Sequence, residues 1–303
     1  MARIASIGEC MIELSEAADT GGQMRRTFGG DTLNTAVYLA RCLRGADAAV
    51  HYVTALGDDP FSAEMLAAWQ QEGIDTGLVF RLPGRLPGLY IIRTDAAGER
   101  SFHYWRSAAA ARELLRAEQA ETLAGALSGF DLVYLSGITL GILDAESRQR
   151  LFALLEALKH AGCRIAFDTN YRPRLWQSRA EAQEAVSRVL ALAAVALPTF
   201  DDEAALFDDG SPAATARRLH ALGVEEVAVK CGSAPCLVSR GGRSAGVAGE
   251  AVARPVDTTA AGDSFNAAYL AARLGGEEPE AAAAAGHRLA ARVIAHKGAI
   301  IPA

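Results

Sequence analysis

The chain has 303 residues, of which 50% are hydrophobic and 22% are charged, so it can bury a large globular core. Its formal net charge of −6 argues against a nucleic-acid or membrane-surface partner, because either partner requires a basic face. The five cysteines lack CxxC spacing, which argues against a zinc site or a disulfide framework, and no uncharged apolar stretch approaches the ~18 residues that span a bilayer. The first residues, MARIASIGECMIEL, predict a strand rather than a signal peptide, and we expect a cytoplasmic protein.

Short apolar runs alternate with longer helical patterns along the chain. The strand-like runs cover residues 2–8, 49–56, 131–137, 163–169, 194–200, 225–231 and 236–240. The helical patterns cover residues 33–43, 60–73, 145–162, 179–193 and 211–223. This alternation predicts an α/β fold with a mostly parallel sheet flanked by helices, and no linker divides residues 1–303 into domains. Ligands of such sheets bind beyond the carboxyl ends of the strands. The polar residues at these ends are Asp168, Asn170, Thr199 and Lys230.

Two segments do not fit this alternation. Residues 11–28 contain a Gly-Gly pair in a polar turn, and residues 88–106 predict a β-hairpin around the turn 95–98. Together they can form a small β-sheet outside the main one. Such a sheet would serve as a lid or as a dimer surface.

Paired glycines precede a helical pattern in FGGDTLNTAVYLAR, residues 28–41. Alone they indicate only a tight turn. Asp31 is a natural N-cap in this position, although its carboxylate can also bind a hydroxyl group.

A run of small residues precedes another helical pattern in DTTAAGDSFNAAYL, residues 257–270. Ala260, Ala261 and Gly262 let a ligand approach their backbone N–H groups, and the start of the following helix adds a partial positive charge. This combination binds anions, phosphate above all. Asp263 at the positive end can accept a proton from a hydroxyl group beside the phosphate, or it can merely cap the helix.

This stretch resembles the second signature of the PfkB (ribokinase-like) carbohydrate kinases, D-T-x-G-A-G-D. The matching positions are Asp257, Thr258, Ala261, Gly262 and Asp263. Ala260 replaces the first glycine of the signature, and because alanine disfavours positive φ, this replacement argues against a left-handed backbone there. The resemblance implies that Asp263 takes the proton from the sugar hydroxyl group. It also implies that the backbone of residues 260–262 stabilises the transferring phosphoryl group.

The resemblance extends over nearly the whole chain. Gly30 and Asn34 match the family's sugar-contacting GG-x(n)-N signature, and GDDPFSAEMLAAWQQEGID at residues 57–75 follows a pattern common in these kinases. It implies a ribokinase-like fold in which a small β-sheet covers the sugar. Family members often pair such lids, so we expect a homodimer or a higher homo-oligomer.

Several segments resemble the 2-keto-3-deoxygluconate kinases of this family: GGDTLNTAVYLAR, RLPGLYIIRTD, DTNYRPRLW, DTTAAGDSF and KGAIIP. A buried sugar-acid carboxylate must be neutralised, whereas a neutral sugar needs only hydroxyl partners. Arg106 and Arg172 lie in segments expected near the sugar and can supply this charge even in an acidic protein. The substrate contacts that the resemblance implies are Gly30, Asp31, Asn34, Tyr90, Tyr104, Arg106, Asn170, Arg172 and Asp263. The alternatives are cross-strand packing for the tyrosines and a salt bridge to Asp168 for Arg172.

The nucleotide side of the site is less distinct. Lys230 and Gly232 resemble the family's strand-end KxG element, which lies along ATP together with residues 260–262, although a lone lysine is more often exposed in a loop. Gly286 and His287 occupy the neighbourhood in which family members bring an Asn near the adenine.

The family's N-x-x-E element helps to organise Mg²⁺ through water. LPTFDDEA, residues 197–204, occupies its place without the asparagine. Either Asp202 or Glu203 can take the role of the glutamate, and an acidic surface turn is the alternative. No GxxxxGK[ST] loop is present, which excludes a P-loop kinase.

Together these features predict that ATP phosphorylates 2-keto-3-deoxygluconate at its 6-hydroxyl group, with Mg²⁺, to give 2-keto-3-deoxy-6-phosphogluconate. Two alternatives stay open: another sugar kinase of the family, such as a fructokinase or a ribokinase, and a non-catalytic sugar-acid sensor. The paired arginines argue against a neutral-sugar kinase, and the intact Gly262 and Asp263 argue against a sensor. The gluconate and galactonate epimers are not distinguished.

Overall fold

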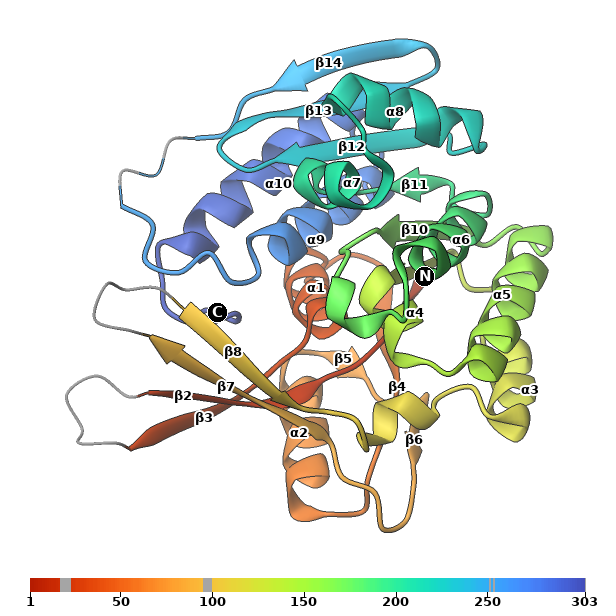
Figure 1. Ribbon diagram of the computed structural model, residues 1–303, viewed down its shortest axis with the longest axis vertical. Coiled ribbons are helices and arrows are strands. Elements are labelled where there is room, and N and C mark those ends of the chain that lie inside the picture. The colour runs from red at the N-terminus through yellow and green to blue at the C-terminus, as the bar shows by residue number, and fades with distance from the viewer. Residues whose placement is uncertain (17–22, 95–99, 251, 253, 303) are drawn as a thin grey trace.

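The computed structural model describes residues 1–16, 23–94, 100–250, 252 and 254–302. These residues form a large β-sheet between layers of helices and a small β-sheet that projects to one side (Figure 1). No helix in the described ranges is long and apolar enough to cross a bilayer. The turns predicted at residues 21–22 and 95–98 lie outside the described residues.

The large sheet has ten strands among the described residues, in the order β14-β13-β12-β11-β10-β9-β1-β4-β5, with β6 paired to β4. The strands from β12 to β6 pair in parallel, whereas β13 and β14 are antiparallel additions at one edge. The bounds are β1 (Ala2–Ile7), β4 (Ala48–Leu56), β5 (Ile74–Asp75), β6 (Val79–Arg81), β9 (Leu132–Ser136), β10 (Arg164–Asp168), β11 (Val195–Ala196), β12 (Glu226–Cys231), β13 (Ala234–Arg240) and β14 (Arg243–Val247). The α/β fold predicted from the sequence is confirmed.

Helices cover both faces of this sheet because successive strand residues point to opposite sides. Ile4 of β1 packs in one core and its neighbour Ala5 packs in the other. The first core contains α1 (Asp31–Cys42), α2 (Pro60–Gln71), α9 (Ala261–Leu274) and α10 (Pro279–Ile294). The second contains α3 (Ala117–Ala126), α4 (Gly137–Ile142), α5 (Ala145–His160), α6 (Arg179–Leu190), α7 (Phe200–Phe207) and α8 (Pro212–Ala221).

Local chemistry accounts for where several helices begin. Asp59 accepts hydrogen bonds from the backbone N–H groups of Phe61 and Ser62, and Pro60 occupies the first position of α2, where a missing N–H costs nothing. Asp144 caps α5 in the same way, by accepting from the backbone of Ser147 at 2.7 Å. These caps place the starts of α2 and α5 at residues 60 and 145, where the alternation of the sequence predicts that helices begin.

The segment 194–200 differs from the prediction of one continuous strand. β11 ends at Ala196, and α7 begins at Phe200 after the N-cap Thr199. Pro198 cannot donate to a strand ladder, which explains the early end. The acidic residues that follow therefore lie on a helix rather than in a surface turn. The sequence pattern also missed α3, α4 and β14, whose apolar periodicity is weak.

The small sheet has the order β3-β2-β7-β8. Its strands are β2 (Met11–Glu16), β3 (Met24–Gly29), β7 (Gly88–Thr94) and β8 (Arg100–Trp105). β7 and β8 pair antiparallel with Tyr90 opposite Tyr104, as expected for the arms of a hairpin, and β2 joins β7 in parallel. The two segments that interrupt the alternation thus form a separate small sheet, as predicted.

Candidate active site

The start of α9 places Asp263 at the carboxyl edge of the large sheet. Its Oδ2 accepts a hydrogen bond of 2.8 Å from Asn34 Nδ2 on α1, and its backbone carbonyl accepts one of 3.2 Å from Thr35. Burial, and after it the charge of Asp31, raises the pKa of Asp263 to about 7. A carboxylate with such a pKa is suited to accept a proton near neutral pH.

The turn before Asp263 forms an anion cradle, which we define as residues 260–263. The backbone N–H groups of Gly262 and Asp263 have no hydrogen-bond partner among the described residues, as expected in the first turn of a helix. Asp257 braces the turn by accepting from the backbone of Thr259 at 2.9 Å and of Gly298 at 2.7 Å. The cradle can therefore bind a phosphoryl oxygen, as the sequence predicts.

Ala260 adopts φ 61° and ψ 16°, so the expectation that alanine would avoid the left-handed region here is wrong. The reason is local. The carbonyl oxygen of Ala260 accepts hydrogen bonds from both the backbone N–H and the hydroxyl group of Ser264, at 2.9 and 2.8 Å. These bonds hold Ala260 as the N-cap of α9 in spite of the strain on its Cβ.

Asp31 lies at the first position of α1, one residue after the N-cap Gly30. Its Oδ2 accepts hydrogen bonds from Ser136 and from Asn170 Nδ2, the latter at 2.9 Å, so it does not cap the helix. Burial is the largest cause that raises the pKa of Asp31. A Cβ on Gly30 would lie 2.1 Å from the carbonyl oxygen of Glu9, which explains the glycine.

Tyr90 and Tyr104 form a cross-strand pair on the small sheet. Their ring centroids lie 5.7 Å apart, so the packing alternative describes their contact correctly. Tyr90 is 7% exposed and donates its hydroxyl hydrogen to Glu13, whereas Tyr104 is 48% exposed. Tyr104 therefore has surface left with which to contact a ligand.

Arg106 and Arg172 come from different parts of the chain, but both influence the pKa of Tyr104. The guanidinium of Arg106 lies 5.7 Å from the ring centre of Tyr104, and the charges of Arg106 and Arg172 both oppose the burial that raises the pKa of Tyr104. Arg106 pairs with the buried carboxylate of Glu9. Arg172 pairs with Asp202 at 3.3 Å, and not with Asp168 as the alternative interpretation held.

Lys230 is buried rather than exposed in a loop. Only 7% of its surface is accessible, and its ammonium donates to Asp168 at 2.7 Å and to Asn266 at 3.0 Å. The backbone of Lys230 also bridges to Thr199. The fourth strand-end residue singled out in the sequence, Asn170, donates its backbone N–H to Asp168 at 3.2 Å and its side-chain amide to Asp31, so all four meet.

The two acidic residues considered for Mg²⁺ differ in access. Glu203 is 0% exposed and accepts from Arg218, and burial is the main cause that raises its pKa to about 7. Asp202 keeps 20% of its side chain accessible, and burial raises its pKa against the opposing charge of Arg172. No group of three or more His, Cys, Asp or Glu side chains in the described part of the chain is arranged to hold a metal.

Gly232 lies in the left-handed region, with φ 59°, just beyond β12. Gly286 lets α10 pack closely on α9, because a Cβ there would lie 2.6 Å from the ring of Phe265. His287 donates to the carbonyl oxygen of Val247 at 3.0 Å, and burial lowers its pKa. The side chain of His287 is therefore bound to the end of β14.

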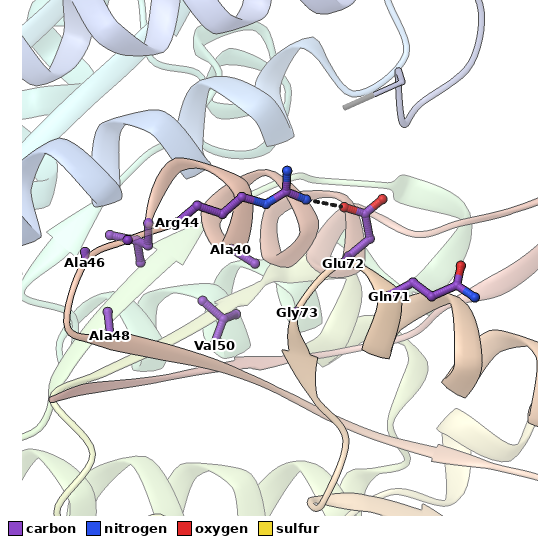
Figure 2. A pocket seen from close by; sticks show the side chains of 10 residues that line it. Ala40, Arg44, Ala46, Ala48, Val50, Gln71, Glu72 and Gly73 are labelled. Carbon is purple, nitrogen blue, oxygen red and sulfur yellow. Dashed lines mark ion pairs between the residues drawn. The ribbon is translucent and has the colours of Figure 1, made fainter.

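A hollow of about 400 Å³ elsewhere on the surface is not this site (Figure 2). Its lining comes from the ends of α1 and α2 and the start of β4, and it includes the ion pair of Arg44 with Glu72, 3.6 Å long. Its first lining residue, Ala40, follows Asp31 by nine residues of α1, which is about 13.5 Å at 1.5 Å per residue. It lies at the amino ends of the strands.

Several buried polar atoms have no hydrogen-bond partner in the described part of the chain, and they include Glu9 Oε1, Asn34 Oδ1 and Arg106 Nε of this site. Unpaired buried polar atoms are costly, so they indicate that a polar ligand belongs here. The sequence pattern did not point to Glu9, Glu13, Ser136 or Asn266. A signal existed for two of them, because Glu9 lies two residues after the end of β1 and Ser136 is the last residue of β9.

Comparison with known proteins agrees with this geometry. A model of the pfkB family of carbohydrate kinases matches residues 1–303. A 2-dehydro-3-deoxygluconokinase of Dickeya dadantii is 50% identical over 303 residues, which cover 99% of this chain and 96% of the relative. One of Escherichia coli K12 is 50% identical over 304 residues, covering 99% and 97%. The structure of an Escherichia coli ribokinase II in complex with ATP and Mg²⁺ aligns with a TM-score of 0.86 and 21% identity, over 99% of this chain and 94% of that chain.

Proposed function

The chain belongs to the PfkB family of carbohydrate kinases, and we propose that it transfers the γ-phosphoryl group of ATP to 2-dehydro-3-deoxygluconate, also called 2-keto-3-deoxygluconate. Both relatives described above carry that activity in their names and match almost end to end at 50% identity. The acceptor would be the primary 6-hydroxyl group, and the product 2-keto-3-deoxy-6-phosphogluconate.

The observation that carries this proposal is the position of the Asp263 carboxylate beside the backbone N–H groups of the anion cradle. Asn34 orients the carboxylate through its 2.8 Å hydrogen bond, so that the carboxylate can accept the proton of the attacking hydroxyl group. As the new P–O bond forms, the bond to the departing ADP breaks and the proton passes to Asp263. The N–H groups of Gly262 and Asp263, which have no backbone partner among the described residues, would donate to the phosphoryl oxygens and stabilise their charge.

The residues present fit a nucleotide and its cation. Lys230 and the residue 260–263 backbone would face the phosphates, and Gly232 would lie along the nucleotide. Bound Mg²⁺ neutralises phosphate charge. Asp202 is the better candidate to orient it through water, because Glu203 is fully buried against Arg218. Gly286 and His287 would border the adenine.

A sugar acid fits the charges of the sugar side. The charges of Arg106 and Arg172 both act on Tyr104, and the buried Arg106 Nε has no hydrogen-bond partner among the described residues. A substrate carboxylate would complete these hydrogen bonds. Gly30, Asp31, Asn34 and Asn170 would contact the hydroxyl groups, and Tyr90 would support Tyr104 from behind.

We infer that residues 1–303 work as one kinase domain whose small sheet closes over the substrate and pairs with a second copy. Tyr104 and Trp105 at the end of β8 are 48% and 60% exposed, which suits a surface that becomes covered. Sedimentation at micromolar concentration tests the pairing. Only monomer would contradict it.

A kinase for a neutral sugar, such as a fructokinase or a ribokinase, is the second candidate. It is less favoured, because a neutral sugar gives the two arginines no charge to neutralise. A non-catalytic sensor is disfavoured by the intact cradle and Asp263. A screen of sugars and sugar acids for ATP-dependent ADP release distinguishes all three. We expect ADP release with the sugar acid, whereas the absence of ADP release with every sugar and sugar acid would support the sensor.

A further inference from the structure

A buried cluster of Asp168, Lys230 and Asn266, which we call the lysine clamp, lies beside the anion cradle. Lys230 Nζ donates to Asp168 Oδ2 and to Asn266 Oδ1. Asn266 Nδ2 donates to the same oxygen of Asp168 at 2.7 Å and to the hydroxyl group of Tyr134 at 3.1 Å. Asn266 is 0% exposed, so the three side chains hold one another away from water.

The clamp allows only one orientation of the Asn266 amide. An ammonium group offers only donors and a carboxylate offers only acceptors. The oxygen of the amide must therefore face Lys230 and its nitrogen must face Asp168. Because both ends of the amide are matched, Asn266 fixes the direction of the ammonium as well as its position.

The clamp also places the ammonium against the cradle. Lys230 Nζ lies 3.4 Å from the position that a Cβ on Gly262 would take, and its charge lowers the pKa of Asp263 against the effect of burial. Asn266 follows Gly262 by four residues, which places both on one face of α9. Two hydrogens of the ammonium go to the clamp, and the third has no partner among the described residues.

We propose that Asn266 is a positioning residue that holds the Lys230 ammonium in place to stabilise the transferring phosphoryl group. The third hydrogen of the ammonium would bond to a phosphoryl oxygen while the bond to ADP breaks and the bond to the sugar forms. Lys230 stays protonated throughout. An ammonium group that is fixed in advance, in a site with little water, does not have to move when negative charge shifts between the phosphoryl oxygens in the transition state. Its exact placement therefore affects the rate. This inference rests on the proposed kinase activity.

A double-mutant cycle tests the proposal. Asn266→Leu keeps much of the side-chain volume and removes the clamp's amide. We expect kcat to fall about tenfold or more, with KM for ATP and for the sugar acid within about threefold, because the loss falls on the transition state. In a Lys230→Met background the same change should alter kcat by less than about twofold, because the ammonium that Asn266 positions is gone. An equal loss in both backgrounds, or a rise in KM at unchanged kcat, would overturn the proposal.

Tyr269→Phe is the matched control on the same helix. Tyr269 is also 0% exposed and donates to Glu226 at 2.9 Å, away from the clamp, so its loss should lower stability without lowering kcat. If Asn266→Leu does not fold, Asn266→Ser serves in the same cycle, because it leaves room for water. If the wild-type enzyme phosphorylates a different sugar, the proposed substrate is wrong. The same double-mutant cycle is then measured with that sugar.

Discussion

Replacing Arg106 by lysine tests the substrate class most sharply. The side chain of Arg106 is 12% exposed and pairs with Glu9, whose side chain is 1% exposed. Arg106→Ala would leave Glu9 as an uncompensated buried charge, which costs about 3–5 kcal/mol of stability and confuses the result. Lysine keeps the charge beside Glu9 but cannot reproduce the planar, two-pronged geometry of a guanidinium.

The expected loss follows from that geometry. Removing one partner of a buried charge-assisted pair costs about 2–5 kcal/mol, and lysine retains part of the pairing. We therefore expect Arg106→Lys to cost about 1.4–3 kcal/mol, which corresponds to about 10- to 150-fold in kcat/KM for the sugar acid. A neutral analogue such as fructose, if it is turned over, should lose less than about threefold, because it presents no carboxylate.

A coupled ADP-release assay on both substrates gives the comparison. Arg148→Lys is the matched control, because Arg148 of α5 is also 12% exposed and is ion-paired, to Glu181 of α6 at 2.9 Å. Its kcat/KM should stay near that of the wild type. Equal losses for the acid and the neutral sugar in Arg106→Lys would refute the carboxylate role and leave Arg106 a structural residue or a phosphate ligand.

Four further outcomes are expected. Asp263→Asn should lower kcat by about 10²- to 10⁴-fold with little change in KM, and near-wild-type turnover would rule out its role as base. Because the pKa of Asp263 is raised to about 7, kcat/KM should fall as pH drops through about 7, and a flat profile down to pH 5 would contradict this. The raised pKa also means that the contribution of Asp263 to stability, complete below its ordinary pKa, is lost as pH rises through about 7, so Asp263→Asn should raise Tm more at pH 8 than at pH 5. Ala260→Gly should raise the free energy of unfolding by about 0.5–1 kcal/mol by relieving the positive φ, and a lower Cm in urea would show that the strain is absent.

The sequence predicted the large sheet and the meeting of its strand ends because both follow from local patterns. Asp168 and Lys230 each end a buried apolar run, and parallel strands bring such ends to one edge. Asp263 was identified from small residues before a helix, which is also a local signal. These residues need no knowledge of distant contacts to be found.

The residues that were missed depend on contacts distant in sequence. Asn266 looks like an ordinary helix residue, and only the packing of α9 against β10 and β12 makes it the partner of Asp168 and Lys230. Glu9 pairs with Arg106, 97 residues away, and nothing in the local pattern links them. The positive φ of Ala260 was misjudged because the intrinsic preference of alanine was outweighed by two hydrogen bonds from Ser264.

The most direct test of the kinase assignment is to incubate the full chain with ATP, Mg²⁺ and 2-keto-3-deoxygluconate and to follow the phosphorus by ³¹P NMR. We predict ADP and, in equal amount, one phosphomonoester coupled to the protons of the primary carbon, both formed at least about 10²-fold more slowly with Asp263→Asn. ADP formed without a phosphomonoester would contradict the kinase assignment, as would no reaction of the sugar acid when parallel incubations with fructose or ribose give a phosphorylated sugar.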